Sequence, residues 1–326
     1  MRLIHDGASG PTALKPAPAT AGAATTAGAA GAAAAGAAVR RTARVRRRAT
    51  HRSVRDHILH ALPCLAALLT AALIGFLIIY ILVMGIPHIS PDLFSITYNS
   101  VNVSLMPALI NTVLMTLLAL AFAVPIGLGG AIFLAEYARR GNRLVGLIRI
   151  AADTLAGVPS IVYGLFGLLF FVTMLGWRMS LLAGACTLAI MILPLIISTA
   201  EEALRAVPDA WREGSFGLGA GRLRTVGRIL LPSALPGILA GVILGIGRIV
   251  GESAALIYTA GTATSLPTSL FDSTRTLSVH MYVLASEGLH LEKTYATAVV
   301  LLLLVLLINT ASVVLARRLS RKVRNV

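Results

Sequence analysis

Long apolar segments recur along the chain and are separated by shorter polar ones. Six of them reach the roughly 20 residues that a helix needs to cross a hydrocarbon core of about 30 Å. We place these helices at about 61–85, 107–134, 151–175, 180–199, 237–259 and 295–316. The alternating segments of about 10 residues that are typical of membrane β-barrels do not occur in the sequence. The pattern therefore predicts an all-α integral membrane protein with six transmembrane helices.

The composition supports a lipid environment. Hydrophobic residues make up 57% of the 326 residues and charged residues 13%, which leaves too little polar surface to cover a soluble domain of this size. Both cysteines, Cys64 and Cys186, fall inside predicted spans and show no metal-ligand spacing. We interpret them as apolar filler, and we predict no metal site.

The formal net charge of +15 raises the question of nucleic-acid binding, which the distribution of the charges answers. Lysines and arginines cluster before the first span and after the second, fourth and sixth spans. The 87–105 loop has none, and the 260–294 loop has only Arg275 and Lys293. This alternation is the positive-inside pattern. It places both termini and the 201–235 loop in the cytoplasm, leaves the other two loops outside to meet an external partner, and argues against a nucleic-acid surface.

The N-terminal region has a different composition from the rest of the chain. Residues 17–38 are almost wholly Ala, Gly, Thr and Pro, which bury too little surface to offset their ordering entropy. The first apolar stretch lies behind 60 residues, so we expect an uncleaved anchor; whether the tail is made in the cell or reflects a start codon set too early stays open. The expected divisions are a disordered basic tail, a first helix with an outer loop, a transport domain and a basic C-terminus, at 1–56, 57–106, 107–316 and 317–326.

Glycine and proline gather inside the second and third spans, at 123–131 and 155–167. A proline within a span frees a carbonyl, so such breaks tend to be buried in protein or to line a cavity. Gly157 and Pro159 therefore indicate either a translocation path or close helix packing, and both readings stay open. Ser160 is the nearest polar candidate, because its hydroxyl and a local N–H would face an anion at a helix break.

Two opposite charges fall in the fifth predicted span. Arg248 and Glu252 are four residues apart, which places them on one face of a continuous helix. Charges at membrane depth are costly and require a partner or a watery cavity. One interpretation is a structural Arg–Glu pair; the other is that Arg248 recognises a passing anion while Glu252 sets its orientation.

The 201–238 segment is charged, yet it carries enough apolar side chains to pack as short helices. Pro208 and Asp209 form a helix start, and Gly219 and Gly221 allow a sharp turn before a second short helix at about 222–231. We expect a helix-turn-helix at the membrane surface that transmits force from a partner to the spans.

A spacing pattern runs through the same segment: an acidic residue and two small ones, a glycine after three residues, and an Ile-x-Leu-Pro group after nine more. Its members are Glu213, Gly214, Ser215, Gly219, Ile229, Leu231 and Pro232. It resembles the E-A-A-x3-G-x9-I-x-L-P motif in membrane subunits of ATP-binding-cassette (ABC) importers, with Gly214 and Ser215 in place of the two alanines. The resemblance implies a coupling helix that docks in a cleft of an ATPase subunit.

Three further segments, at 155–167, 247–261 and 276–288, are similar to phosphate-importer permeases, and the last of them, together with 295–309, favours the PstA type over the PstC type. The similarity covers about 61–320. It implies a type I ABC importer (MetI-like) fold in a bacterial inner membrane, and a permease subunit that forms half of a phosphate pathway. The implied partners are two copies of an ATPase, a PstC-like permease and an extracytoplasmic phosphate-binding protein.

The resemblance also implies that Arg248 and Glu252 act in the substrate path. The sequence has no Walker-type G-x-x-x-x-G-K-[ST] motif, so ATP and Mg would be bound by the partner ATPase, with no cofactor on this chain and no catalytic residue.

Other readings stay open at this point. One is another oxyanion as substrate, and a second is the role of the PstC-type partner subunit. A third, from a different class, is a stand-alone secondary transporter, which would show two related halves in its sequence; we find no such repeat. An intramembrane enzyme would need a nucleophile–base or metal constellation, and His280 and His290 sit in an outer loop without one.

Overall fold

The computed structural model describes residues 54–138 and 143–324, and these residues form helices and connecting loops without strands. The tail expected at 1–56 lies almost wholly outside the described residues. Two compact units divide after Gly75, so that the first long helix, α2 (Val54–Gly85), contributes to both. The second unit begins at Phe76 and holds the remaining elements described below.

α2 is followed by two short 3-10 turns, η1 (Ile86–His88) and η2 (Pro91–Phe94), each with a proline at its start. At the end of α2, Gly85 packs against the backbone of Tyr295 so closely that a Cβ would find no room. The Tyr80 and Tyr295 rings meet edge to face one turn earlier, with centroids 5.9 Å apart. The last turns of α2 are therefore fastened to the final helix, α12 (Leu291–Arg324).

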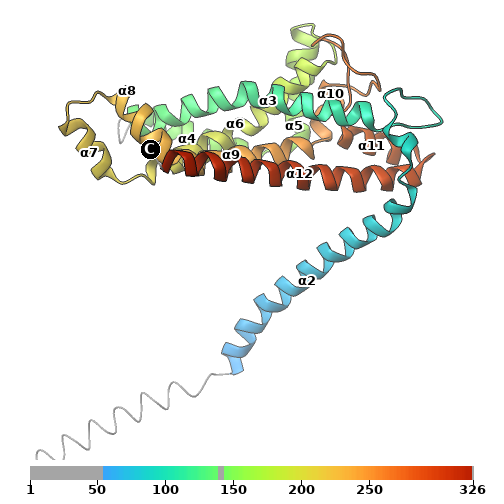
Figure 1. The fold of residues 1–326 in the computed structure, drawn as a ribbon, viewed down its shortest axis with the longest axis horizontal. Helices are drawn as coiled ribbons and strands as arrows, with labels where there is room; N and C mark the ends of the chain where they lie inside the picture. Colours follow the sequence, from blue (N-terminus) through green and yellow to red (C-terminus); the bar gives the residue numbers. More distant parts are fainter. Residues whose placement is uncertain (1–53, 139–142, 325–326) are drawn as a thin grey trace, which may run out of the picture. The chain divides into compact units, whose positions relative to one another are not determined.

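Three more long helices run beside α12 in the second unit (Figure 1). They are α3 (Met106–Ile132), which continues as the π-helical turn η3 (Phe133–Tyr137), α6 (Leu181–Arg205) and α9 (Leu231–Val250). α6 packs against both α3 and α9, and α9 packs against α12. α6 is also the most buried of the candidate spans, which makes it the central helix of this unit.

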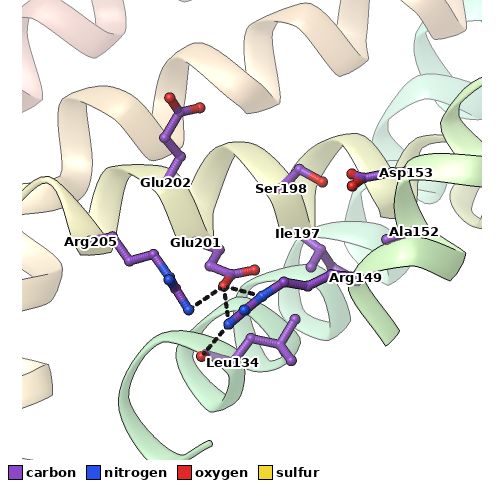
Figure 2. Close-up of a pocket in the computed structure, with 9 residues that line it drawn as sticks. All are labelled: Leu134, Arg149, Ala152, Asp153, Ile197, Ser198, Glu201, Glu202 and Arg205. Atoms are coloured by element: carbon purple, nitrogen blue, oxygen red, sulfur yellow. Dashed lines mark hydrogen bonds and ion pairs between the residues drawn. The ribbon is translucent and has the colours of Figure 1, made fainter. Parts of the chain in front are cut away.

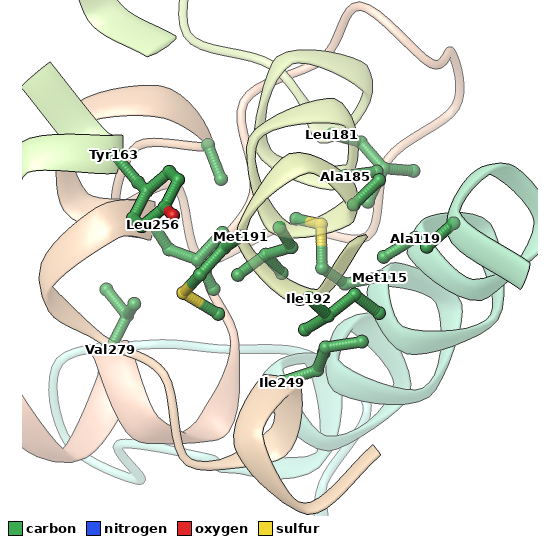
Figure 3. Packing of buried hydrophobic residues seen from close by; sticks show 14 of the residues in the cluster. Met115, Ala119, Tyr163, Leu181, Ala185, Met191, Ile192, Ile249, Leu256 and Val279 are labelled. Atoms are coloured by element: carbon green, nitrogen blue, oxygen red, sulfur yellow. The ribbon is translucent and has the colours of Figure 1, made fainter. Parts of the chain in front are cut away.

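The core gathers around α6, as Figure 3 shows. Met191 and Ile192 on α6 are almost fully buried among Met115 of α3, Ile249 of α9 and Leu256. Lipid tails are as apolar as these side chains, so close packing rather than transfer from water holds such helices together.

Glycines of α9 serve the same packing. Gly237 lies against Ala203 of α6 and Gly241 against Thr199, at distances that leave no space for a Cβ. These two glycines are packing contacts, which let α6 and α9 approach each other closely.

Within residues 54–138 and 143–324, five helices are long and apolar enough to cross a membrane, and a bent pair raises the number to as many as six. The pair replaces the single span expected at 151–175, which is wrong in its start and its shape. α4 (Arg143–Ala156) ends before Gly157, and α5 (Ser160–Gly167) begins after Pro159 and continues as a π-helical turn, η4 (Leu168–Met174). The axes meet at 104°. Pro159 has an extended backbone (φ −58°, ψ 140°) that turns the chain between them.

The span expected at 237–259 is also wrong in its bounds. The apolar helical stretch runs from Arg222 to Val250, and α10 (Ala254–Thr259) is a separate short helix. Ser253, with φ −122°, leaves the helical region between them. Arg248 and Glu252 therefore do not share one continuous helix face, because the helix ends before Glu252.

The 201–235 segment forms the helix-turn-helix that the sequence predicts. α7 (Asp209–Gly217) begins after Pro208, and a turn at Gly219 leads into α8 (Arg222–Thr225) and the π-helical turn η5 (Val226–Leu230). α7 and α8 project from one end of the second unit, and α11 (Leu277–Glu287) lies at the other end (Figure 1).

Candidate functional site

The bent span and the short helix that follows α9 meet where α5 packs on α10. A Cβ on Gly164 would lie 2.8 Å from the Ala255 Cα, and one on Gly167 would lie 2.6 Å from the Thr259 side chain. Because residue numbers increase in the same direction along both helices, α5 and α10 run parallel, and the start of α10 lies beside Gly164, one turn into α5. The breaks at 157–159 and 251–253 therefore lie at matching ends of a single packed pair.

Ser160 occupies the first position of α5, where the N–H groups of a helix have no intrahelical partner and carry the positive end of the helix dipole. Its side chain is half-buried, and its hydroxyl makes no hydrogen bond with any residue that the structure describes. One turn later, the Tyr163 hydroxyl donates to the Leu155 carbonyl at 2.7 Å and so ties α5 back to α4 across the bend.

Arg248 is half-buried in the last turn of α9 and forms no ion pair within residues 54–138 and 143–324. Its charge lies within electrostatic range of the Tyr163 hydroxyl on α5. The structural Arg248–Glu252 pair considered from the sequence is therefore not formed. An unpaired arginine between spans needs an anion or water.

Glu252 forms hydrogen bonds with its neighbours instead of an ion pair with Arg248. Its carboxylate accepts the Ala255 N–H at 3.1 Å, which caps α10, and its carbonyl accepts the Ser278 hydroxyl of α11 at 2.5 Å. The carboxylate thus fixes the direction in which α10 leaves the break.

The segment from Asp209 to Leu230, here called the knob, presents a strongly apolar surface. Trp211, Phe216, Leu218 and Leu223 are 51%, 45%, 91% and 79% exposed. An exposed apolar group of this kind marks an interaction surface.

The candidate motif residues divide between this surface and its support. Glu213 and Gly214 are exposed on α7, while the buried Ser215 hydroxyl lies 2.8 Å from the Thr225 hydroxyl and joins α7 to α8. Gly219 has φ +80°, a conformation that favours glycine, and makes the turn between the two helices.

The remaining motif residues form the base of the knob. Ile229, Leu231 and Pro232 are half-buried where η5 passes into α9. The neighbouring Leu230 is fully buried in a cluster with Leu204 at the end of α6. The base of the knob is thereby packed against α6 and α9.

Arg212 fastens the knob to the second span, a contact that the sequence analysis missed. Its guanidinium donates to the Glu136 carboxylate at 2.8 and 3.1 Å and to the carbonyls of Leu204 and Val207 at 2.7 Å. Both charged side chains are largely buried, at 14% and 10% exposure. Glu136 is the lone acidic residue at the end of an apolar segment, but nothing in the sequence pattern indicates a partner 76 residues away.

A second ion network, which the sequence analysis also missed, joins α4 to α6 (Figure 2). Arg149 of α4 and Arg205 of α6 both donate to Oε1 of Glu201, at 2.8 and 2.9 Å. The three side chains line a pocket of about 270 Å³, together with Asp153 and Glu202. The network joins α4, the first half of the bent pair, to the central helix.

Taken together, these features define a class: a helical membrane protein with a bent span, a helix break after α9, an arginine without an ion pair at that break and an apolar knob at one end. The model of the family described as "Binding-protein-dependent transport system inner membrane component" matches residues 123–325. This chain belongs to that family.

Two named relatives indicate which type of transport subunit the chain is. The chain is 33% identical over 254 residues to the "Probable ABC transporter permease protein YqgI" of Bacillus subtilis, covering 73% of this chain and 86% of the relative. It is 34% identical over 220 residues to the "Phosphate transport system permease protein PstA 1" of Mycobacterium tuberculosis H37Rv, covering 67% and 71%. The chain is thus a PstA-type permease subunit of an ABC importer.

Solved structures agree on the fold. A chain of the bacterial alginate ABC transporter, in complex with an alginate-bound periplasmic protein, aligns over 82% of this chain and 96% of its own length, with a TM-score of 0.60 at 17% identity. The MetNI methionine ABC transporter in an inward-facing conformation gives a TM-score of 0.52 at 22% identity, covering 65% and 93%.

Proposed function

We propose that the chain forms half of a translocation pathway for inorganic phosphate. The observation that carries this proposal is Arg248, which forms no ion pair within the described residues and lies at the end of α9 within electrostatic range of Tyr163 on α5, in a chain whose relatives include phosphate permeases of the PstA type. A guanidinium offers several N–H donors in a fixed fork, which suits a tetrahedral oxyanion.

The proposed substrate path consists of Arg248, Ser160 and Glu252. Arg248 supplies the charge, and the Ser160 hydroxyl and the first N–H groups of α5 supply hydrogen bonds to the anion. Glu252 acts through α10, which it caps, and so keeps the two broken helices in register.

The proposed driving site is the knob. Its exposed apolar side chains dock on an ATPase subunit that binds ATP and Mg, and Glu213, Gly214, Ser215 and Gly219 shape the docking helix and its turn. Ile229, Leu231 and Pro232 pass the motion into α9. This chain itself contributes no catalytic group and no cofactor to the reaction.

The proposed assembly has one copy of this chain, a PstC-like permease, two ATPase subunits and an extracytoplasmic phosphate-binding protein. Both termini and the knob lie in the cytoplasm of a bacterial cell, as the positive-inside pattern indicates. Within the chain, 107–316 would form the transport domain and 57–106 an added helix with its outer loop.

Uptake by the assembled complex tests the proposal. The complex is reconstituted in vesicles with its binding protein, and uptake of radiolabelled phosphate is measured with and without ATP. We expect ATP-dependent uptake that excess sulfate does not reduce. Uptake of sulfate instead would assign a different oxyanion, and uptake by the single chain under an ion gradient would replace the proposal with secondary transport.

A further inference from the structure

The polar side chains near the start of α11 are buried without partners. Among the described residues, the buried side-chain atoms that lack a hydrogen bond are Oδ1 of Asn111, Oγ1 of Thr274, one terminal nitrogen of Arg275 and both ring nitrogens of His280. All four side chains are at most 4% exposed. Each unsatisfied buried group is costly, and a buried unpaired guanidinium is the most costly of them.

These residues belong to one region of the fold. The Tyr98 ring lies under the Arg275 guanidinium, 4.8 Å from its carbon to the ring centroid, and meets the His280 ring edge to face at 6.2 Å. Asn111 reaches the same region, because its amide donates to the Ser265 carbonyl and its neighbour Thr112 accepts the N–H of Leu277.

Tyr98 sits on a loop that is both organised and strained. Asn99 and Asn102 bind each other's backbone, and Lys293 donates to the Val101 carbonyl at 2.6 Å. Val103, which is 1% exposed, has φ +45°, a rare conformation for a β-branched residue. Strain of this kind tends to persist at ligand clamps.

The region adjoins the proposed path. Ser278, at the start of α11, donates to the Glu252 carbonyl at the break between α9 and α10. A ligand held at Arg275 would therefore lie on the α11 side of that break, whereas Arg248 precedes it on α9.

We propose that Arg275, His280, Thr274 and Asn111 form an entry site for protonated phosphate, covered by Tyr98. The proposal rests on the phosphate function proposed above and adds a second site to it. Arg275 donates to a phosphate oxygen, while the Asn111 oxygen and one His280 nitrogen each need a donor, which the two P–OH groups of dihydrogen phosphate provide. Sulfate has no such hydrogen at neutral pH.

The state of His280 fits this role. Burial, and then the charge of Arg275, lower the pKa of His280 to about 3, against a weak opposing contact with the Val103 backbone. The ring is neutral at physiological pH, so it offers one donor and one acceptor.

Cysteine protection tests the site independently of transport. Thr274→Cys is introduced into the full complex, with Cys64 and Cys186 replaced by alanine, and labelled from outside with an anionic methanethiosulfonate. We expect slow labelling that Tyr98→Ala accelerates, and a rate that phosphate reduces at least roughly tenfold while sulfate does not. Tyr282→Ala, which removes an exposed tyrosine on α11, should leave the rate unchanged.

Arg275→Gln should abolish the protection, and Arg178→Gln, at an exposed arginine, should keep it. If phosphate leaves the labelling rate unchanged while wild-type uptake is intact, the buried polar groups bind ordered water only. That result would overturn the entry site, and the proposed phosphate function would stand. Equal protection by sulfate would overturn the hydrogen-bond argument. Protection without any phosphate uptake would support the site and count against the proposed function.

Discussion

At the residue scale, the decisive feature is Arg248, an arginine between spans that forms no ion pair with a carboxylate of the described residues. Lipid provides no counter-ion, so the positive charge of Arg248 is tolerated only if water or an anion reaches it. The sequence singles out Arg248 and leaves two readings open, an ion pair with Glu252 or a contact with an anion. The ion pair is not formed, because i and i+4 do not lie on one helix when the helix ends at Val250.

Replacing Arg248 by alanine should abolish phosphate uptake while assembly with the partner chains persists. Arg248→Lys keeps the charge but loses the fork of donors, so we expect uptake reduced by roughly tenfold or more. Uptake in vesicles and co-purification of the partner chains are measured together. Arg178→Ala, outside the site, is the control; normal uptake by Arg248→Ala would remove this arginine from the path.

The buried His280 predicts a pH dependence of stability. Its pKa is lowered in the folded chain, so the unfolded chain binds the proton more readily and acid favours unfolding. Stability should be complete above about pH 6.5 and fall by at most about 1.4 kcal/mol per pH unit below it, as far as about pH 3. Thermal melting in detergent from pH 7.5 to 4.5 measures this, and His280→Asn should flatten the profile.

At the element scale, the breaks in the third and fifth spans show how far sequence reasoning reaches. Span number follows from length and apolarity, because lipid requires every backbone group to be bonded within the helix. Pro159 also indicates, from the sequence alone, where the third span breaks. The break at 251–253 carries no proline, and it depends on contacts with α5 and α11 that no local pattern contains.

Close packing of α5 on α10 predicts an effect of volume at Gly164. In Gly164→Ala the new methyl group would lie 2.8 Å from the Ala255 Cα, so the two helices must separate. We expect a loss of about 1–3 kcal/mol in stability and reduced uptake. Gly129→Ala, where nothing lies within 4 Å, should match the wild type in melting temperature and transport. Equal behaviour of the two variants would contradict the close contact.

The turn of the knob predicts a conformational effect at Gly219. Alanine at φ +80° is strained by about 1 kcal/mol or more, so Gly219→Ala should reduce phosphate uptake per ATP hydrolysed without preventing membrane insertion. A bulky charged residue there should uncouple the two activities more completely. Gly217→Ala lies two residues away with an ordinary φ and should remain coupled. Full coupling in both variants would argue against a shaped turn.

At the scale of the whole molecule, ion contacts join elements that are distant in sequence. Arg212 links the knob to the end of the second span, and Glu201 links α4 to α6. Neither contact is predictable from spacing, because each partner lies on an element whose position only the complete fold determines. The knob itself is predictable, since its motif and its helix signals are local.

The Arg212–Glu136 contact predicts non-additive effects. Arg212→Gln leaves the buried Glu136 charge without its partner and should cost about 3–5 kcal/mol in stability. Glu136→Gln should cost less, because Arg212 keeps an ion pair with the exposed Asp209 at 3.1 Å. The double variant removes both charges and should cost less than the sum of the two. A double-mutant cycle on melting and on ATP-driven uptake measures the coupling; additive costs would show that the pair does not act as a unit.

The exposed side chains of the knob have a practical consequence for the subunit when it is made alone. Lipid covers the spans in any membrane, but Trp211, Leu218 and Leu223 lie at the end of the bundle and are exposed in the chain alone. Such a patch favours self-association and capture by chaperones or proteases. Production of this chain together with its ATPase should therefore raise its yield, its cellular lifetime and its monodispersity in detergent.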